Sequence, residues 1–170
     1  HAHYDHAGGL REYVAEGITV ITHESNKAFY EQAWARPHTV EDTAPTTNKP
    51  MIETVGDKRI LSDRTHTVEL YFLNGHQHHS GQLIAYLPKE RILFAVDFVP
   101  IQSVMFRDMP DGYLPDWLDS IDRVLALDWT TLIPGHPAPG GRMGTKDDVR
   151  AVKEYLTDLS NATRELASQG

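Results

Sequence analysis

Four side chains that can bind a metal ion stand within the first six residues of the chain. The run reads HAHYDH from His1 to His6, and the chain contains no cysteine. In an extended or turning segment, residues i and i+2 point the same way, so His1 and His3 can converge on one ion. Asp5 and His6 then remain for a second ion. The spacing therefore indicates a metal site built from imidazole nitrogens and carboxylate oxygens.

Three later segments carry side chains of the same kinds. Residues 76–81 read HQHHSG, an apolar run over residues 92–96 leads to Asp97, and residues 133–136 end on the pair Gly135-His136. Together with the N-terminal run, these segments resemble the metallo-β-lactamase superfamily. Its signature is HxHxDH, a later His in an HxxG-like turn, an Asp that closes a strand, and a final Gly-His. The resemblance spans positions 1 to 136.

The resemblance implies two metal sites that share one carboxylate. It assigns His1, His3 and His78 to one ion, assigns Asp5, His6 and His136 to the other, and makes Asp97 the bridge between them. His78 is preferred because it precedes Gly81 by three residues, which is the spacing of the HxxG turn. His76 and His79 are the alternatives. The implied cofactors are two zinc ions, with iron or manganese also compatible with nitrogen and oxygen ligands.

Two positions depart from the family pattern without removing a ligand. Val96 stands where the family usually has Gly before the bridging Asp, and His79 stands where Ser or Thr is common. A β-branched residue does not readily take the positive φ values open to glycine. Val96 therefore restricts the backbone that presents Asp97.

The bulk composition is that of one globular domain over residues 1–170. The chain has 170 residues, 40% of them hydrophobic, which is enough for a hydrophobic core. The resemblance implies an α/β (α+β) fold, the αββα sandwich. Because His1 is itself an implied ligand, we expect the strands that precede the motif in the family to be missing from this chain. No signal peptide is recognisable, and the sequence leaves the localisation open.

The hydrophobic pattern predicts alternating elements that would position these ligands. Strands are expected over residues 18–22, 51–55, 59–61, 67–73, 83–87, 91–96 and 131–133, and helices over residues 10–16, 25–34, 115–127 and 146–167. Ser25 is expected to cap the second helix. The final helix carries a stripe expected to be core, made of Val149, Val152, Leu156, Leu159 and Leu166. The Thr- and Pro-rich stretch over residues 36–50 is expected to be a surface loop that borders the pocket.

The charge distribution and the length of the apolar runs argue against two classes of partner, nucleic acids and membranes. The net charge is −8, and the 16 Lys and Arg are scattered rather than gathered into a stripe. Binding to a nucleic-acid backbone needs such a stripe, so we expect no nucleic-acid partner. No apolar run reaches the roughly 18 to 20 residues of a membrane span, so no membrane partner is expected either. His23, His38 and His66 lack a ligand context and are expected to be solvated.

A metal site of this composition would perform hydrolysis. Zinc with an open coordination position lowers the pKa of bound water to about 7, and a second ion roughly 3.5 to 4 Å away stabilises the oxyanion that forms. Asp5 is the candidate catalytic residue, because it is both an implied ligand and the nearest carboxylate to carry the proton. The expected substrate is a small molecule with an ester, lactone, thioester or amide-type bond. The sequence does not indicate the oligomeric state.

Three further hypotheses for the site stay open. The same ligands can hold a single iron in a sulfur dioxygenase of this fold, the site can have β-lactamase activity, or it can be a non-catalytic metal-binding module. The apolar run over residues 98–106, with Met109, Tyr113 and Trp117, is either one wall of the pocket or part of the core beneath it.

Overall fold

The computed structural model describes residues 1–36, 49–75, 78–105, 112–136 and 138–170, and these contain two sheets. The smaller sheet pairs β1 (Val20–His23) with β2 (Ile52–Val55) in parallel. The larger sheet has the order β3 (Lys58–Ser62), β4 (Thr67–Phe72), β5 (Leu83–Leu87), β6 (Ile92–Ala95) and β7 (Thr131–Pro134). Neighbouring strands are antiparallel from β3 to β6, whereas β7 runs parallel to β6.

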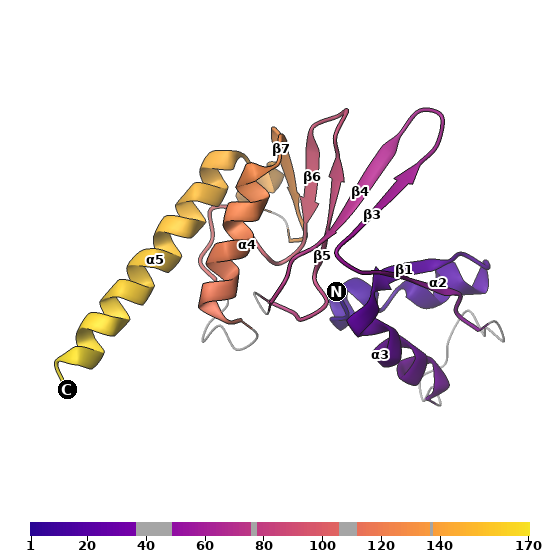
Figure 1. Cartoon of the computed structure of the whole chain (residues 1–170), viewed down its shortest axis with the longest axis horizontal. Helices are drawn as coiled ribbons and strands as arrows, with labels where there is room; N and C mark the ends of the chain where they lie inside the picture. The colour runs from indigo at the N-terminus through magenta and orange to yellow at the C-terminus, as the bar shows by residue number, and fades with distance from the viewer. Residues whose placement is uncertain (37–48, 76–77, 106–111, 137) are drawn as a thin grey trace.

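The described residues also form five α-helices and a short 3₁₀ turn. They are α1 (Tyr4–Ala7), α2 (Leu10–Ala15), α3 (Glu24–Ala35), α4 (Leu114–Ala126) and α5 (Lys146–Ser168), with a 3₁₀ turn η1 at Pro139–Gly141. In Figure 1, α4 and α5 lie beside the larger sheet, α2 and α3 lie with β1 at the other end of the molecule, and the N-terminus lies between them. This mixed α/β arrangement confirms the expected fold class.

The main core fills the space between the larger sheet and helices α4 and α5. Apolar residues recur at helical spacing on α4, where Trp117, Ile121 and Val124 are all buried. They meet strand residues that alternate with exposed ones, such as Leu93 and Ala95 of β6, which are both 0% exposed. Each fully buried large aliphatic side chain contributes about 1.5 to 3 kcal/mol to the stability of the fold. This packing therefore holds β6 and β7 in place, the strands that precede Asp97 and His136.

The predicted strands and helices are present with small shifts at their ends, but the start of α3 differs from expectation. Its N-cap is His23 rather than Ser25, and the His23 Nδ1 atom accepts a hydrogen bond from the Ser25 backbone N–H at 3.3 Å. His23 is only 6% exposed and its ring stacks on Phe72 at 3.7 Å. The expectation of a solvated His23 is therefore wrong. His66 is exposed as expected, whereas His38 lies outside the described residues.

The apolar stripe of α5 is core only over its first half. Val149, Val152 and Leu156 are buried, but Leu159 is 40% and Leu166 is 69% exposed. The prediction fails for the last two because the helix continues past the sheet and α4 that cover its beginning (Figure 1). Helical periodicity predicts which face of a helix is apolar, but it does not predict how far along the helix the neighbouring elements cover that face.

The apolar run after Asp97 belongs mostly to the core. Five residues of the proposed wall are buried in the main core cluster: Phe98, Val99, Ile101, Met105 and Trp117. Tyr113 is 58% exposed, and Phe106 and Met109 lie outside the described residues, as does most of the Thr- and Pro-rich stretch. None of the helices in the described ranges combines the length and apolar character needed to cross a membrane.

Candidate metal centre

The N-terminal motif is divided between an extended start and a short helix. The backbone carbonyl of His3 accepts hydrogen bonds from the N–H groups of His6 and Ala7, at 3.1 and 2.9 Å, and so starts α1. The rings of His1 and His3 come together before the helix, with centroids 4.5 Å apart. Asp5 and His6 lie within the helix, so the motif offers two separate pairs of candidate ligands.

Two further candidate ligands follow the ends of adjacent parallel strands. Asp97 comes two residues after β6 and His136 comes two residues after β7. The register pairs Ala95 with Pro134, so the chain leaves both strands at the same level of the sheet. Parallel strands end at the same edge of a sheet, so Asp97 and His136 lie at one edge. This edge lies against the N-terminal motif, because His6 contacts Asp97, which is 91 positions further along the chain.

The predicted ligands gather into two clusters that share Asp97. One contains His1, His3, His78 and Asp97, the other contains Asp5, His6, Asp97 and His136, and the candidate ligand atoms of each cluster lie within 4.8 Å of one another. All seven predicted residues are therefore brought together. Among the described residues, Asp97 alone belongs to both clusters.

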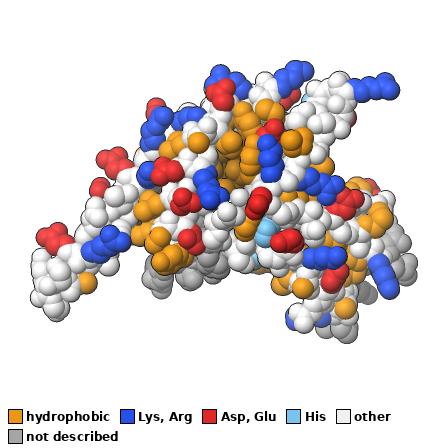
Figure 2. All heavy atoms as spheres, viewed as in Figure 1, with side chains coloured by type: hydrophobic (Ala, Val, Ile, Leu, Met, Phe, Trp, Pro, Cys, Tyr) orange, Lys and Arg blue, Asp and Glu red, His pale blue; other side chains and the backbone are white. Residues whose placement is uncertain are grey.

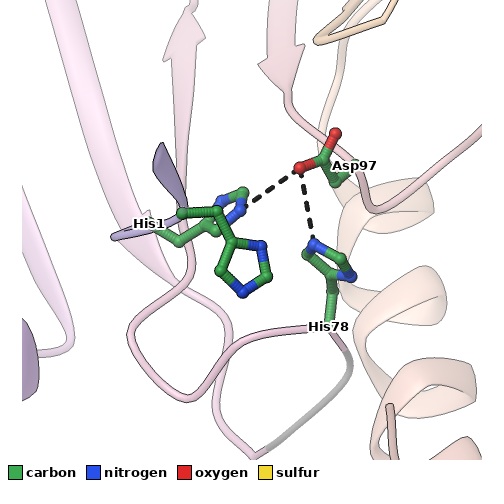
Figure 3. A group of neighbouring side chains, drawn as sticks. His1, His78 and Asp97 are labelled. Atoms are coloured by element: carbon green, nitrogen blue, oxygen red, sulfur yellow. Dashed lines mark ion pairs between the residues drawn. The ribbon is translucent and has the colours of Figure 1, made fainter. Parts of the chain in front are cut away.

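The first cluster surrounds one oxygen of Asp97. The Nε2 atoms of His1 and His78 lie 3.2 and 3.4 Å from Asp97 Oδ2 and approach it from different directions (Figure 3). The rings of His1 and His78 meet edge to face, with centroids 5.0 Å apart. The His3 ring lies 4.9 Å from that of His78.

The second cluster is more open to solvent. His6 Nε2 lies 2.6 Å from Asp97 Oδ2, and His136 Nε2 lies 2.6 Å from Asp97 Oδ1. Asp5 Oδ2 lies 3.3 Å from His6 Nε2 and 3.5 Å from His136 Nε2. The side chain of Asp97 is 8% exposed, but those of Asp5 and His136 are 38% and 63% exposed. Among the described residues, the second cluster is therefore exposed at Asp5 and His136. In Figure 2, histidine surface bordered by acidic side chains is visible near the middle of the face shown.

The residues of both clusters fit a metal ion. Among the described residues, His1 Nδ1, His1 Nε2, His78 Nε2 and Asp97 Oδ1 are buried without a hydrogen bond, although some lie close to one another. Each buried polar atom left without a partner costs about 1 to 3 kcal/mol. Imidazole nitrogens and carboxylate oxygens that converge in this way are a suitable donor set for zinc, and also for iron or manganese.

Electrostatics favour the ionised carboxylate of Asp97. Burial alone would raise the pKa of Asp97, but the adjacent imidazoles of His78, His6 and His136 outweigh it and hold the pKa below its ordinary value. A carboxylate must be deprotonated to bind a metal. The surroundings of Asp97 therefore favour its ligand form.

The turn that carries His78 is fixed by α3. Asn26, which is 3% exposed, donates from Nδ2 to the Gly81 carbonyl at 3.0 Å and to Thr22 Oγ1 at 3.2 Å. A Cβ atom at Gly81 would lie 2.5 Å from Asn26 Cγ, so only glycine permits this approach. Tyr30, one turn further along α3, donates from its hydroxyl to the His1 carbonyl at 3.3 Å. Sequence reasoning missed both residues, because a single Asn or Tyr in a helix carries no motif.

The structure places His78 rather than His79 among the clustered ligands. The Nδ1 atom of His79 accepts a hydrogen bond from the Gly81 N–H at 3.1 Å, and its ring packs against those of His1 and His3 at 5.4 and 5.0 Å. His79 belongs to neither cluster. His76, which could also have filled this position, lies outside the described residues.

Val96 stands where the family usually has glycine, and the structure accommodates it at two neighbouring residues, Asp97 and Gly135. Asp97 itself takes the positive φ, at 60°, and Val96 does not. The side chain of Val96 packs against the segment that follows β7, where a Cβ atom at Gly135 would lie 2.8 Å from Val96 Cα. Gly135 is thus required beside Val96, and His136 follows it directly.

Comparison with known proteins identifies the family. A profile of the metallo-β-lactamase superfamily matches residues 1–136, a span that includes all seven clustered residues. The chain belongs to the metallo-β-lactamase superfamily. The family match thus supports the fold and the metal-binding pattern of the clustered residues.

Individual relatives are distant and longer than this chain. It is 26% identical over 136 residues to the 2,4-dinitroanisole O-demethylase subunit alpha of Nocardioides sp. (strain JS1661), a match that covers 80% of this chain and 38% of that protein. A metallo-β-lactamase from Pontibacter korlensis superposes with a TM-score of 0.68 at 21% identity, covering 92% of this chain and 66% of the other. The DIM-1 metallo-β-lactamase gives 0.67 at 19% identity, covering 94% and 67%. At these identities the two solved structures show the fold alone.

Proposed function

We propose that this protein is a hydrolase that uses two zinc ions, one in each cluster, to cleave an ester, lactone, thioester or amide-type bond of a small molecule. The observation that carries this proposal is the position of Asp97, whose two oxygens face both clusters. A carboxylate shared in this way is the usual device for holding two ions close together.

The bound ions would supply a Lewis acid and a water whose pKa is lowered to about 7. The side chains of this chain supply the rest. His1, His3 and His78 would hold one ion in the buried part of the site, and Asp5, His6 and His136 would hold the other at the exposed part. No Ser or Cys nucleophile is required.

Asp5 has the position of a proton carrier. Its Oδ2 atom lies 3.5 Å from His136 Nε2, and its side chain is 38% exposed, so a proton on this oxygen can pass to solvent or to a leaving group. Asp97 is 8% exposed and contacts imidazoles of both clusters, which suits a ligand and not a proton carrier. The two carboxylates therefore take different roles.

The distant relative favours a second candidate substrate class. The 2,4-dinitroanisole O-demethylase subunit alpha is 26% identical to this chain over 136 residues, which are 80% of this chain and 38% of that protein. We therefore include removal of a methyl group from an activated aryl ether among the candidate reactions. The mononuclear iron dioxygenase, the β-lactamase and the non-catalytic module are the competing hypotheses.

Metal content measured by mass spectrometry is the first test, followed by a substrate panel. The panel contains lactones, thioesters, aryl esters, β-lactams and 2,4-dinitroanisole. Two zinc ions per chain together with turnover of a lactone, thioester or aryl ester would support the proposal, whereas turnover of β-lactams alone would favour the β-lactamase and turnover of 2,4-dinitroanisole alone the demethylation. One iron per chain would favour the dioxygenase, and bound zinc without turnover would favour the non-catalytic module. A protein that binds no metal would contradict the assignment of the site.

A further inference from the structure

The backbone at Asp97 has an unusual conformation that the surrounding structure must hold in place. Asp97 has a φ of 60°, in the left-handed region that residues with a Cβ atom rarely adopt. Such conformations persist where neighbouring groups over-determine them, and they cluster at functional sites. Asp97 follows β6 directly after Val96, so the groups that hold this segment decide where its carboxylate lies.

Two buried side chains donate hydrogen bonds to the carbonyls on either side of Asp97. Gln82 Nε2 donates to the Val96 carbonyl at 2.8 Å, and Trp117 Nε1 donates to the Phe98 carbonyl at 2.9 Å. The Val96 carbonyl belongs to the peptide group that enters Asp97, and the orientation of this group defines the φ of Asp97. The two donors therefore restrain the chain immediately before and immediately after the bridging residue.

Gln82 is an unusual residue to find in this position. Gln82 is 0% exposed. Within the described part of the chain, its Oε1 atom has no hydrogen-bond partner. A buried amide that satisfies only half of its hydrogen-bonding capacity costs folding free energy relative to an apolar side chain. Its donor half must therefore contribute something that an apolar side chain cannot.

Gln82 also connects two segments that carry ligands. It directly follows the turn of residues 78–81, and its backbone N–H donates to the His79 carbonyl at 3.2 Å. Its side chain reaches the strand end before Asp97. One residue thus couples the position of His78 to that of Asp97.

Trp117 makes an equivalent connection from α4. The residue is 4% exposed, and its ring stacks on Phe98 and meets the His78 ring edge to face, each with centroids 6.5 Å apart. The indole therefore contacts the segment after Asp97 and the ring of His78 together.

We propose that Gln82 and Trp117 are positioning residues of the metal centre: their buried N–H groups hold the backbone on both sides of Asp97 so that one carboxylate serves both clusters. This inference rests on the proposed two-metal function. It assigns no direct contact with a metal or a substrate to either residue.

The test uses variants that remove each N–H donor and leave an apolar side chain of related shape. Gln82→Met replaces the amide by an apolar group of similar length, and Trp117→Phe keeps an aromatic ring without the N–H. Trp129→Phe is the matched control, because Trp129 is 1% exposed and donates from Nε1 to the Val124 carbonyl at 2.8 Å. This control loses the same kind of buried bond within the same core, but its acceptor lies in α4 and not beside a ligand.

Zinc affinity is measured by competition with a chromophoric chelator, and thermal melting of the metal-free proteins reports their stability. We expect Gln82→Met and Trp117→Phe to bind zinc about tenfold to a hundredfold more weakly than the parent, the range found when outer partners of metal ligands are removed. Trp129→Phe should bind zinc with the affinity of the parent, even if its melting temperature falls as far as those of Gln82→Met and Trp117→Phe. The visible absorption of bound cobalt should change only in the first two variants.

Unchanged zinc affinity in folded Gln82→Met and Trp117→Phe would overturn the inference and leave the metal centre intact. Equal weakening in Trp129→Phe would also overturn it, because it would show a general loosening of the core. If Gln82→Met does not fold, the comparison of zinc affinity between Trp117→Phe and the control Trp129→Phe decides the test. A parent protein that binds no zinc would contradict the proposed metal centre, and the inference with it.

Discussion

At the scale of single residues, the two carboxylates of the centre differ in what surrounds them. The side chain of Asp97 is 8% exposed and lies among the imidazoles of both clusters, whereas that of Asp5 is 38% exposed at the edge of the second cluster. A buried carboxylate can hold a fixed geometry, and an exposed one can exchange protons with solvent. This contrast separates the role of a ligand from that of a proton carrier.

We predict that Asp5→Asn loses turnover while the protein stays folded. General acid–base groups typically contribute about 10²- to 10⁴-fold to the rate, so kcat/KM on the best panel substrate should fall by a factor in that range. The amide is nearly isosteric and lies at an exposed position, so circular dichroism melts of the metal-free variant should match those of the metal-free parent. Asp158→Asn, at an exposed position on α5, is the control. Full activity of Asp5→Asn would reject the assigned role.

A second prediction separates the neighbouring histidines of the turn. His78→Ala should reduce the metal content by about one ion per chain, because His78 belongs to a four-residue cluster of the kind that holds a zinc ion. His79→Ala should keep both ions, because its Nδ1 atom bonds the Gly81 N–H and the residue lies outside both clusters. Metal content by mass spectrometry distinguishes the two variants. The reverse pattern would make His79 the ligand.

Sequence reasoning could group the seven clustered residues because their types and spacing form a pattern. It could not find Asn26 or Gln82, whose importance comes from what they contact after folding. It also misassigned His23, because burial of that ring depends on the stack with Phe72, 49 positions away in the printed sequence. Motifs report residues that act together, whereas the residues that hold them in place have no signature of their own.

At the scale of elements, the start of α5 shows how local sequence fixes a boundary. Thr145 and Asp148 form a capping box, in which the Thr145 hydroxyl faces the Asp148 N–H and the Asp148 carboxylate accepts from the Thr145 N–H at 2.8 Å. Arg142 adds a charged hydrogen bond to Asp148 at 2.5 Å. These contacts satisfy backbone groups that the first turn of a helix leaves unpaired.

This arrangement predicts a stability that depends on pH. The Arg142 guanidinium and the Thr145 donors outweigh burial and lower the pKa of Asp148 from 3.8 to about 2. A lowered folded-state pKa means that the stabilisation is complete above the unfolded value and is lost as the pH falls through the folded value. Asp148→Asn should therefore lower the free energy of unfolding at pH 7 by about 1 kcal/mol, the usual size of a cap.

Urea unfolding at a series of pH values checks this expectation. The difference between the parent and Asp148→Asn should be constant above pH 4 and shrink toward pH 2. Asp147→Asn serves as the control, because its exposed carboxylate on the same turn pairs only with Arg150 among the contacts described for it. A difference that persists unchanged at low pH would show that Asp148 acts through its shape and not its charge.

At the scale of the whole molecule, the centre joins parts of the chain that otherwise belong to different layers. The N-terminal motif precedes the smaller sheet and α3, whereas the other three residues belong to the larger sheet: His78 lies in the loop between β4 and β5, and Asp97 and His136 follow the ends of β6 and β7. Periodicity predicted the individual strands of both sheets, but their αββα arrangement followed from the resemblance alone, because pattern does not say which strands pair. The clustered ligands lie where the two halves meet.

Metal binding should therefore stabilise the whole fold, because an unfolded chain cannot assemble ligands from four distant segments. A ligand at a hundred times its Kd adds about 2.7 kcal/mol, which corresponds to a rise in Tm of roughly 5 to 10 °C for a domain of this size. Removal of metal with a chelator should lower Tm by about that amount, as measured by calorimetry, and added zinc should restore it. Asp97→Ala, which removes the shared ligand, should melt at the same temperature with and without zinc. If the parent binds zinc yet melts at one temperature in both conditions, zinc binds the unfolded chain as well as the folded one, and the ions do not hold the two halves together.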